Sequence, residues 1–254
     1  RNIERLARAD LAGWVARQYT GANVIVAVAG GIDVDALVKE AERCLGALPA
    51  GEPNQVAAPA WVGGLRSRKL VGSGQTHAVL GLPIARLADN DPVPELAAVL
   101  FGEGMSSPLM AELRERRGLV YYAACSADAL DLCGEFVVEA SFAPDKQAQV
   151  LGEVARLLRA QADAIAPDDL ERAHNQITVR RRLEPALDLY ALGRLRSSAE
   201  RVERVRAVTA EQLRATFQRM LEAPVALALA GRLGRGVTEQ AASALGGLTL
   251  AAHA

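Results

Sequence analysis

Two stretches of the chain match each other, NVIVAVAG at residues 23–30 and PVALALAG at residues 224–231. Each is a short apolar run closed by a glycine, which is typical of a strand buried on both faces. A pattern that predicts a helix precedes each run, starting with IERLARAD at residues 3–10 and with VERVRAVT at residues 202–209. A helix and a strand that return after roughly 200 residues indicate a duplicated module. We therefore expect one whole module in this chain, preceded by the tail of another.

The composition is that of an ordinary globular protein. Of the 254 residues, 50% are hydrophobic and 23% are charged, which is enough apolar material to bury a core in one or two domains. The formal net charge of −1 gives no reason to expect nucleic acid or an anionic membrane surface as a partner. No apolar run reaches the roughly 18 residues that a membrane-spanning helix needs, so we expect no membrane insertion. Frequent alanine and arginine favour a bacterial source. Of the two bacterial compartments, periplasm and cytoplasm, we expect the periplasm slightly more.

The three cysteines do not identify the compartment. Cys125 and Cys133 flank a predicted hairpin, so their spacing is compatible with a disulfide. An odd number of cysteines without metal-ligand spacing favours buried free thiols, and this includes Cys44.

The chain divides by composition into three parts. Residues 1–49 form the tail of the first module, with helices predicted over 10–20 and 33–48 around a strand at 24–29. Residues 50–65 are rich in proline and glycine and are expected to be a linker. The complete second module covers residues 66–254, and its last part, about 235–254, is expected to be a flexible tail.

The second module alternates groups of strands with groups of helices. The patterns predict strands at 68–84, 119–130, 134–143 and 225–230, and helices at 92–101, 106–117, 145–164, 167–182 and 186–206, with a last helix that a capping box of Thr209 and Gln212 begins. Such grouping predicts an α+β fold, a two-layer sandwich in which helices cover a mostly antiparallel sheet.

The strongest local signal is GEGMSSPLMAELRERRGLVY at residues 102–121. Pro108 suits the first turn of a helix, and Gly118 suits a left-handed helix stop, after which a strand begins. Arg114 then lies in the last turn of the helix and Tyr121 in the strand that leaves it. The reversal at Gly118 can bring the guanidinium and the phenol towards one cleft.

These residues resemble the zinc-free module of the pitrilysin/insulinase zinc peptidases, a family that includes the mitochondrial processing peptidases. The family pattern Leu-Arg-Glu-x-x-Gly-Leu-x-Tyr is matched by LRERRGLVY at residues 113–121. The resemblance extends over nearly the whole chain. A glycine-rich turn with a serine is matched by Gly102, Gly104 and Ser106 or Ser107. The end of the preceding module is matched by Tyr19, Asn23, Gly30, Leu48 and Pro49. Pro108 and Tyr122 depart from the family pattern, which usually has an arginine and a small polar residue at these positions.

The resemblance implies roles for Arg114 and Tyr121. In the family, this arginine and tyrosine reach the zinc site of a partner module and donate hydrogen bonds to the substrate carbonyl and to the tetrahedral oxyanion. Without the resemblance, Arg114 would be interpreted as part of a solvated charge run and Tyr121 as a sheet-packing residue. Because neighbours on a strand point to opposite faces, the presence of Tyr122 leaves open which tyrosine faces the cleft, although the spacing favours Tyr121.

The chain lacks the zinc motif of the family, which needs two histidines four residues apart on a helix, a glutamate between them and a further glutamate. Its three histidines, His77, His174 and His253, are isolated in sequence, and we expect none of them to bind metal. No cofactor is expected in this chain, and the zinc is expected on a partner module.

The resemblance therefore predicts a zinc-free module or subunit that is inactive alone and works with a zinc-bearing peptidase module or subunit on a peptide substrate. The alternative is a catalytically inert structural or peptide-binding relative, like the core subunits of respiratory complexes that share the processing-peptidase fold.

Overall fold

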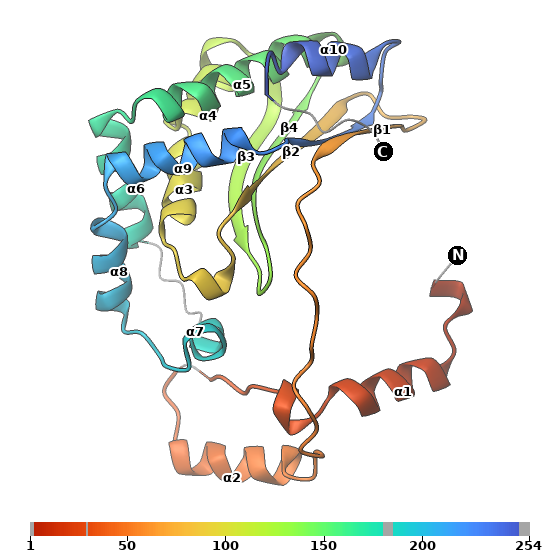
Figure 1. Cartoon of the computed structure of the whole chain (residues 1–254), viewed down its shortest axis with the longest axis vertical. Helices are drawn as coiled ribbons and strands as arrows, with labels where there is room; N and C mark the ends of the chain where they lie inside the picture. Colours follow the sequence, from red (N-terminus) through yellow and green to blue (C-terminus); the bar gives the residue numbers. More distant parts are fainter. Residues whose placement is uncertain (1–2, 29, 180–184, 249–254) are drawn as a thin grey trace. The chain divides into compact units, whose positions relative to one another are not determined.

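The computed structural model describes residues 3–28, 30–179 and 185–248 of the chain (Figure 1). The chain divides into two compact units. The first unit comprises residues 1–57 and 182–196, and the second comprises residues 58–181 and 197–254.

A five-stranded sheet forms the basis of the second unit. Its strands lie in the order β1-β5-β2-β4-β3. β1 and β5 are parallel, and the other neighbouring strands are antiparallel. The bounds are Gly64–Lys69 for β1, Thr76–Ile84 for β2, Val120–Ala129 for β3, Gly134–Phe142 for β4 and Ala226–Gly231 for β5.

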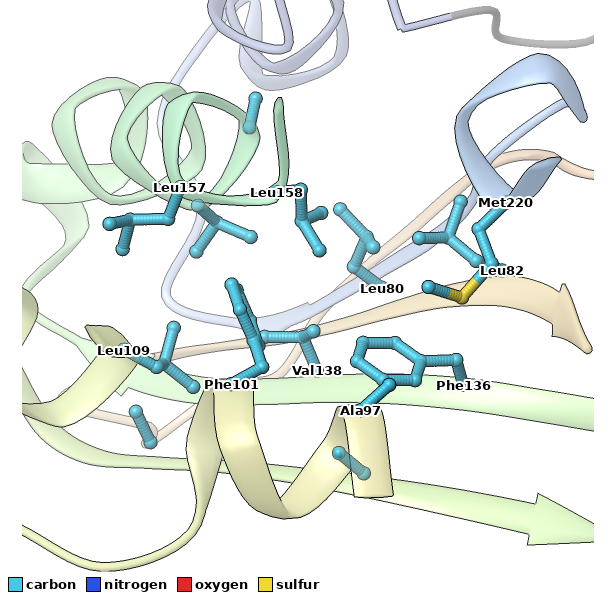
Figure 2. Close-up of a cluster of buried hydrophobic side chains, with 14 of the residues drawn as sticks. Leu80, Leu82, Ala97, Phe101, Leu109, Phe136, Val138, Leu157, Leu158 and Met220 are labelled. Atoms are coloured by element: carbon cyan, nitrogen blue, oxygen red, sulfur yellow. The ribbon is translucent and has the colours of Figure 1, made fainter. Parts of the chain in front are cut away.

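Helices cover one face of this sheet, which confirms the predicted α+β sandwich (Figure 1). Along β2, Leu80 and Leu82 point into the core, and Phe136 and Val138 of β4 do the same (Figure 2). The helices that complete the layer are α3 (Val93–Gly102), α5 (Gln147–Asp163), α6 (Pro167–Val179), α8 (Ser198–Arg206), α9 (Ala210–Glu222) and α10 (Val237–Ala244).

The centre of the core is a cluster of three aromatic rings. Phe101 of α3, Phe136 of β4 and Phe217 of α9 are fully buried, and their ring centroids lie 5.8–6.0 Å apart. Tilted and edge-on contacts at this distance are favourable beyond the area that they bury. The cluster ties one strand to two helices that are far apart in the sequence.

The first strand region differs from the prediction. The single strand expected over residues 68–84 is two strands, β1 and β2, separated by a turn in which Gly72 has a φ of 84°. β1 also begins inside the expected linker, at Gly64. The reason is tertiary, because β1 exists through its pairing with β5, where Leu65 lies opposite Leu227. Trp61 also ties the end of the expected linker to this unit, since its indole Nε1 donates to the carbonyl oxygen of Pro224 at 2.5 Å.

The helix expected over residues 186–206 is interrupted. It consists of α7 (Pro185–Leu192) in the first unit and α8 in the second. Gly193 adopts a φ of 65°, which ends α7, and Ser197 begins α8 by accepting a hydrogen bond from the amide of Glu200. The helix expected over 167–182 is described as far as Val179, and its last residues lie outside the described part of the chain.

The flexible tail expected over 235–254 is wrong for its first part, because residues 237–244 form α10. Gln147 of α5 donates to the carbonyl oxygen of Val237 at 2.9 Å, and Arg159 of α5 donates to that of Leu245 at 2.7 Å. Ala241 and Leu245 are fully buried. The order comes from docking on α5, which the polar, glycine-bearing sequence does not reveal. Residues 249–254, which include His253, lie outside the described residues.

The first unit contains the two helices predicted for the tail of the first module, α1 (Arg8–Gln18) and α2 (Val34–Leu45), together with α7. Asp33 caps α2 by accepting from the amides of Asp35 and Ala36 at 3.0 and 3.1 Å.

The strand expected at 24–29 is not formed. Residues 24–28 have no regular structure, and residue 29 lies outside the described part. Ile25, Val26 and Val28 are between 43% and 49% exposed. A strand needs hydrogen-bonding neighbours, and the described residues of the first unit contain no other strand that could supply them.

Candidate functional site

The glycine-rich turn at residues 102–104 sits against the sheet. Gly102 ends α3 directly over β3, where a Cβ on this glycine would lie 2.2 Å from the Cβ of Cys125. Gly104 then reverses the chain with a φ of 82°. Only glycine fits the first position, because the backbone of α3 and the strand approach each other so closely there.

Of the two candidate serines in the motif, Ser107 is the one that is buried and hydrogen-bonded to the backbone. It is fully buried and begins α4 (Pro108–Met110), where its hydroxyl accepts from the amide of Met110 at 3.4 Å and donates to the carbonyl oxygen of Gly104 at 2.7 Å. Ser106, the other candidate, is exposed. Ser107 therefore acts as a helix cap that secures the turn.

The helix that carries Arg114 is not a regular α-helix. After the single turn α4, the chain continues as the π-helix η4 (Ala111–Arg116). The amide of Arg117 bonds to the carbonyl oxygen of Glu112 at 3.2 Å, and the amide of Leu119 reaches that of Leu113 at 2.8 Å. The α-helix expected over 106–117 is corrected in this respect. π-turns are rare overall, but many of those known lie at functional sites. The hydrophobic periodicity of the sequence does not predict them.

The arginines of the charge run differ in how closely they are paired. Glu112 accepts from Arg116 at 2.9 Å and from Arg117 at 2.7 Å, and these arginines, Arg117 first, hold the pKa of this carboxyl below its ordinary value. Arg114 stands outside this group, with a half-exposed side chain whose ion partner is Glu115, 4.0 Å from its Nε. Within residues 113–121, Arg114 is thus the arginine whose guanidinium is least engaged.

The two tyrosines lie at an irregular point of β3. Val120 lies opposite Phe142 and Tyr122 lies opposite Ser141, so Tyr121 is the extra residue of a β-bulge. A bulge breaks the alternation of a strand. Tyr121 and Tyr122 are accordingly both exposed, at 60% and 51%, rather than one buried and one exposed. The exposure alone does not choose between them.

Arg114 and Tyr121 lie at the two ends of the turn formed by residues 117–119. No hydrogen bond or ion pair among the described residues joins their side chains. The structure therefore places both on one continuous segment with their polar ends available, without linking them to each other.

The other candidates that the structure describes are histidines and cysteines. His77 lies on β2 and His174 on α6. Within the described residues, no three His, Cys, Asp or Glu side chains gather closely enough to hold a metal ion. Cys125 and Cys133, the two positions compatible with a disulfide, are free thiols that are partly buried, and Cys44 is a free thiol that is exposed, so the expected burial is wrong for Cys44. Burial raises the pKa of the Cys125 thiol well above its ordinary value, which disfavours the thiolate form. None of the described helices is long and apolar enough to span a membrane.

The helix-covered sheet and the glycine-rich turn agree with the fold expected for the inactive module of a pitrilysin-type peptidase. The family described as the peptidase M16 inactive domain matches residues 5–177. The chain belongs to this family, which confirms the resemblance drawn from its sequence.

Curated relatives carry the name zinc protease. An uncharacterized zinc protease of Rickettsia bellii is 29% identical over 179 residues, which is 70% of this chain and 43% of that protein. One from Streptomyces coelicolor is 29% identical over 175 residues, 63% of this chain and 37% of that protein. The chain thus spans less than half the length of these relatives.

Solved structures show the same fold. The peptidase M16 inactive domain from Pseudomonas fluorescens aligns with a TM-score of 0.79 at 21% identity, covering 91% of this chain and 59% of that one. A chain of complex III from Candida albicans also aligns with a TM-score of 0.79, at 15% identity, covering 96% and 63%.

Proposed function

We propose that this chain is the zinc-free module of a pitrilysin-type peptidase and that it supplies Arg114 and Tyr121 to a zinc site on another module or subunit. The observation that carries the proposal is the state of Arg114. Its neighbours Arg116 and Arg117 are held by Glu112, whereas Arg114 is half-exposed with a carboxylate no closer than 4.0 Å. A guanidinium in this state is free to bind a group from outside the module.

The chemistry of the pair suits peptide hydrolysis. The guanidinium is permanently charged and offers several N–H donors, and the phenol of Tyr121 offers an O–H donor. Zinc bound on the other module would supply the activated water. Arg114 and Tyr121 would donate to the substrate carbonyl oxygen and to the oxyanion that replaces it. Fixed donors aimed at a developing charge lower the barrier by about 2.7–4 kcal/mol each in a known case.

The partner module is proposed to precede this one, on the same parent chain or as a separate subunit. The relatives named zinc proteases are more than twice as long as the segment that they share with this chain, which leaves room for a second module. Residues 1–49 would be the end of that module. In support, β5 of the complete module pairs with β1 on one side and β2 on the other, while its sequence counterpart at 24–28 is unpaired and exposed.

The direct test is Arg114→Ala in the assembled, zinc-loaded enzyme. We expect kcat to fall by about 100- to 1,000-fold, because one donor to the oxyanion is lost. The matched control is Arg116→Ala, which removes a more exposed arginine from the same helix and should retain the activity. An unchanged kcat in Arg114→Ala would contradict the proposal and favour the alternative of a catalytically inert structural or peptide-binding relative.

A further inference from the structure

A series of ion pairs links the π-helix η4 to α5. Arg117, the residue that follows η4, donates from Nε to Glu112 at 2.7 Å and places its Nη2 3.4 Å from Oε2 of Glu153. Glu153 belongs to α5, and its side chain is only 8% exposed. Arg117 therefore bridges a carboxylate of its own segment and a nearly buried carboxylate of a neighbouring helix.

Glu153 is held by a second arginine as well. Arg156, one turn along α5, also donates to it, from Nε at 2.7 Å. A buried carboxylate is costly unless it is paired, and two arginines offset the cost here. Because Arg156 remains after any change at position 117, loss of Arg117 does not leave Glu153 without a partner.

A depression of about 530 Å³ lies between the turn and α5, lined by Arg117, Leu119, Ala148, Gln149, Gly152 and Glu153. Beside this depression, the Arg117–Glu153 pair is a polar connection between the end of η4 and the helix layer.

We propose that Arg117 is a positioning residue for Arg114 and Tyr121, held in place by Glu153. This inference rests on the proposed function. Among the described residues the only ion partner of Arg114 is its sequence neighbour Glu115, 4.0 Å away, so the place from which its side chain reaches out depends on the backbone that carries it. If the π-turn relaxed to an α-helix, the helical register of the residues after it would shift. Each residue of that shift would rotate their side chains about the helix axis by roughly 100°. The link from Arg117 to α5 opposes this change and keeps the two functional side chains at the ends of one defined turn.

The first measurement is the activity of Arg117→Gln and Glu153→Gln in the assembled zinc enzyme. We expect kcat to fall at least about tenfold in both variants, with KM changed by no more than about twofold, and Arg117→Lys to restore most of the loss. Arg116→Gln is the matched control, since Arg116 shares Glu112 with Arg117 but has no pair with α5. It should leave kcat within about twofold of the parent enzyme.

The second measurement is hydrogen exchange of residues 111–121 in the chain itself, without zinc or substrate. Exchange should become faster in Arg117→Gln and Glu153→Gln and stay unchanged in Arg116→Gln. Faster exchange with an unchanged kcat would mean that the link serves stability only, which overturns the positioning role.

The two proposals fail in different ways. If Arg114→Ala is inactive while Arg117→Gln retains its kcat, the positioning role is wrong and the proposed function stands. If Arg114→Ala retains its activity, the proposed function is wrong and the positioning role falls with it.

Discussion

Gly102 and Cys125 meet where the end of α3 crosses β3, and a Cβ added to Gly102 would lie 2.2 Å from the Cβ of Cys125 and 3.0 Å from its backbone nitrogen. The glycine before the motif is thus a packing requirement, and it sets the place from which the turn towards Arg114 starts.

Gly102→Ala should therefore destabilise the module. The added methyl group meets strand backbone, which cannot move aside as a flexible side chain would. We expect a loss of at least about 1–3 kcal/mol in the free energy of unfolding, measured with denaturant. Gly152→Ala is the control, because its Cβ would lie 3.5 Å from the nearest atom, the carbonyl oxygen of Ala244. That change inside α5 should be neutral or stabilising by about 0.5–1 kcal/mol. Equal stability of both variants would show that the contact at Gly102 is relieved by a shift of α3.

The bulge in β3 leaves the choice between the two tyrosines to experiment. Tyr121→Phe removes one exposed hydroxyl, and we expect kcat of the assembled enzyme to fall about 10- to 100-fold, because a donor to the oxyanion is lost. Tyr122→Phe makes the same chemical change one residue along the strand and should leave kcat unchanged. The opposite result would assign the role to Tyr122, and no effect in either variant would remove the tyrosine from the proposed mechanism.

Docking of α10 should depend on Arg159. This side chain donates to the carbonyl oxygens of Leu245 and Gly246 at 2.7 and 2.5 Å, at the carboxyl end of α10. Arg159→Ala should cost about 1–3 kcal/mol of stability and expose residues 237–248 to proteolysis. Arg235→Ala, which removes an exposed arginine just before α10, serves as the control and should change neither property. Persistent protection of α10 in Arg159→Ala would mean that Ala241 and Leu245 hold the helix without this cap.

Residues 24–28 should exchange their amide hydrogens quickly in this chain. They have no regular structure, whereas β5, the strand that they match in sequence, is paired on both sides. The exposed apolar side chains Ile25, Val26 and Val28 should also promote self-association. Addition of the upstream module should slow the exchange of this segment to the rate of residues 226–231. A clean monomer by sedimentation, with residues 1–49 already protected from exchange, would contradict the assignment of this segment to an incomplete module.

Much of the second module could be predicted from its sequence because the signals are local. Period-two alternation located β4, helical periodicity located α3, α5 and α9, and the capping box of Thr209 and Gln212 begins α9 as expected. The motif around Arg114 and Tyr121 was visible because a helix, a glycine stop and a strand follow one another within a few residues. The family itself followed from this motif, and the match over residues 5–177 confirms it.

Other features depend on contacts between distant residues, and the local sequence carries no sign of them. β1 forms because it pairs with β5. α10 is ordered because Gln147 and Arg159 bind its two ends. Residues 24–28 form no strand because the described residues of the first unit contain no strand to pair with them.

The sequence by itself determined which residues are candidates, Arg114 and Tyr121, because one short segment carries the pattern by which the chain resembles its family. Only the tertiary structure decided their state. The pairing of Arg116 and Arg117 with Glu112 leaves Arg114 with only a 4.0 Å contact to Glu115, and the bulge exposes both tyrosines. The physical reason is that hydrogen-bond partners and strand register are set by the elements packed around a segment, and these come from the rest of the chain.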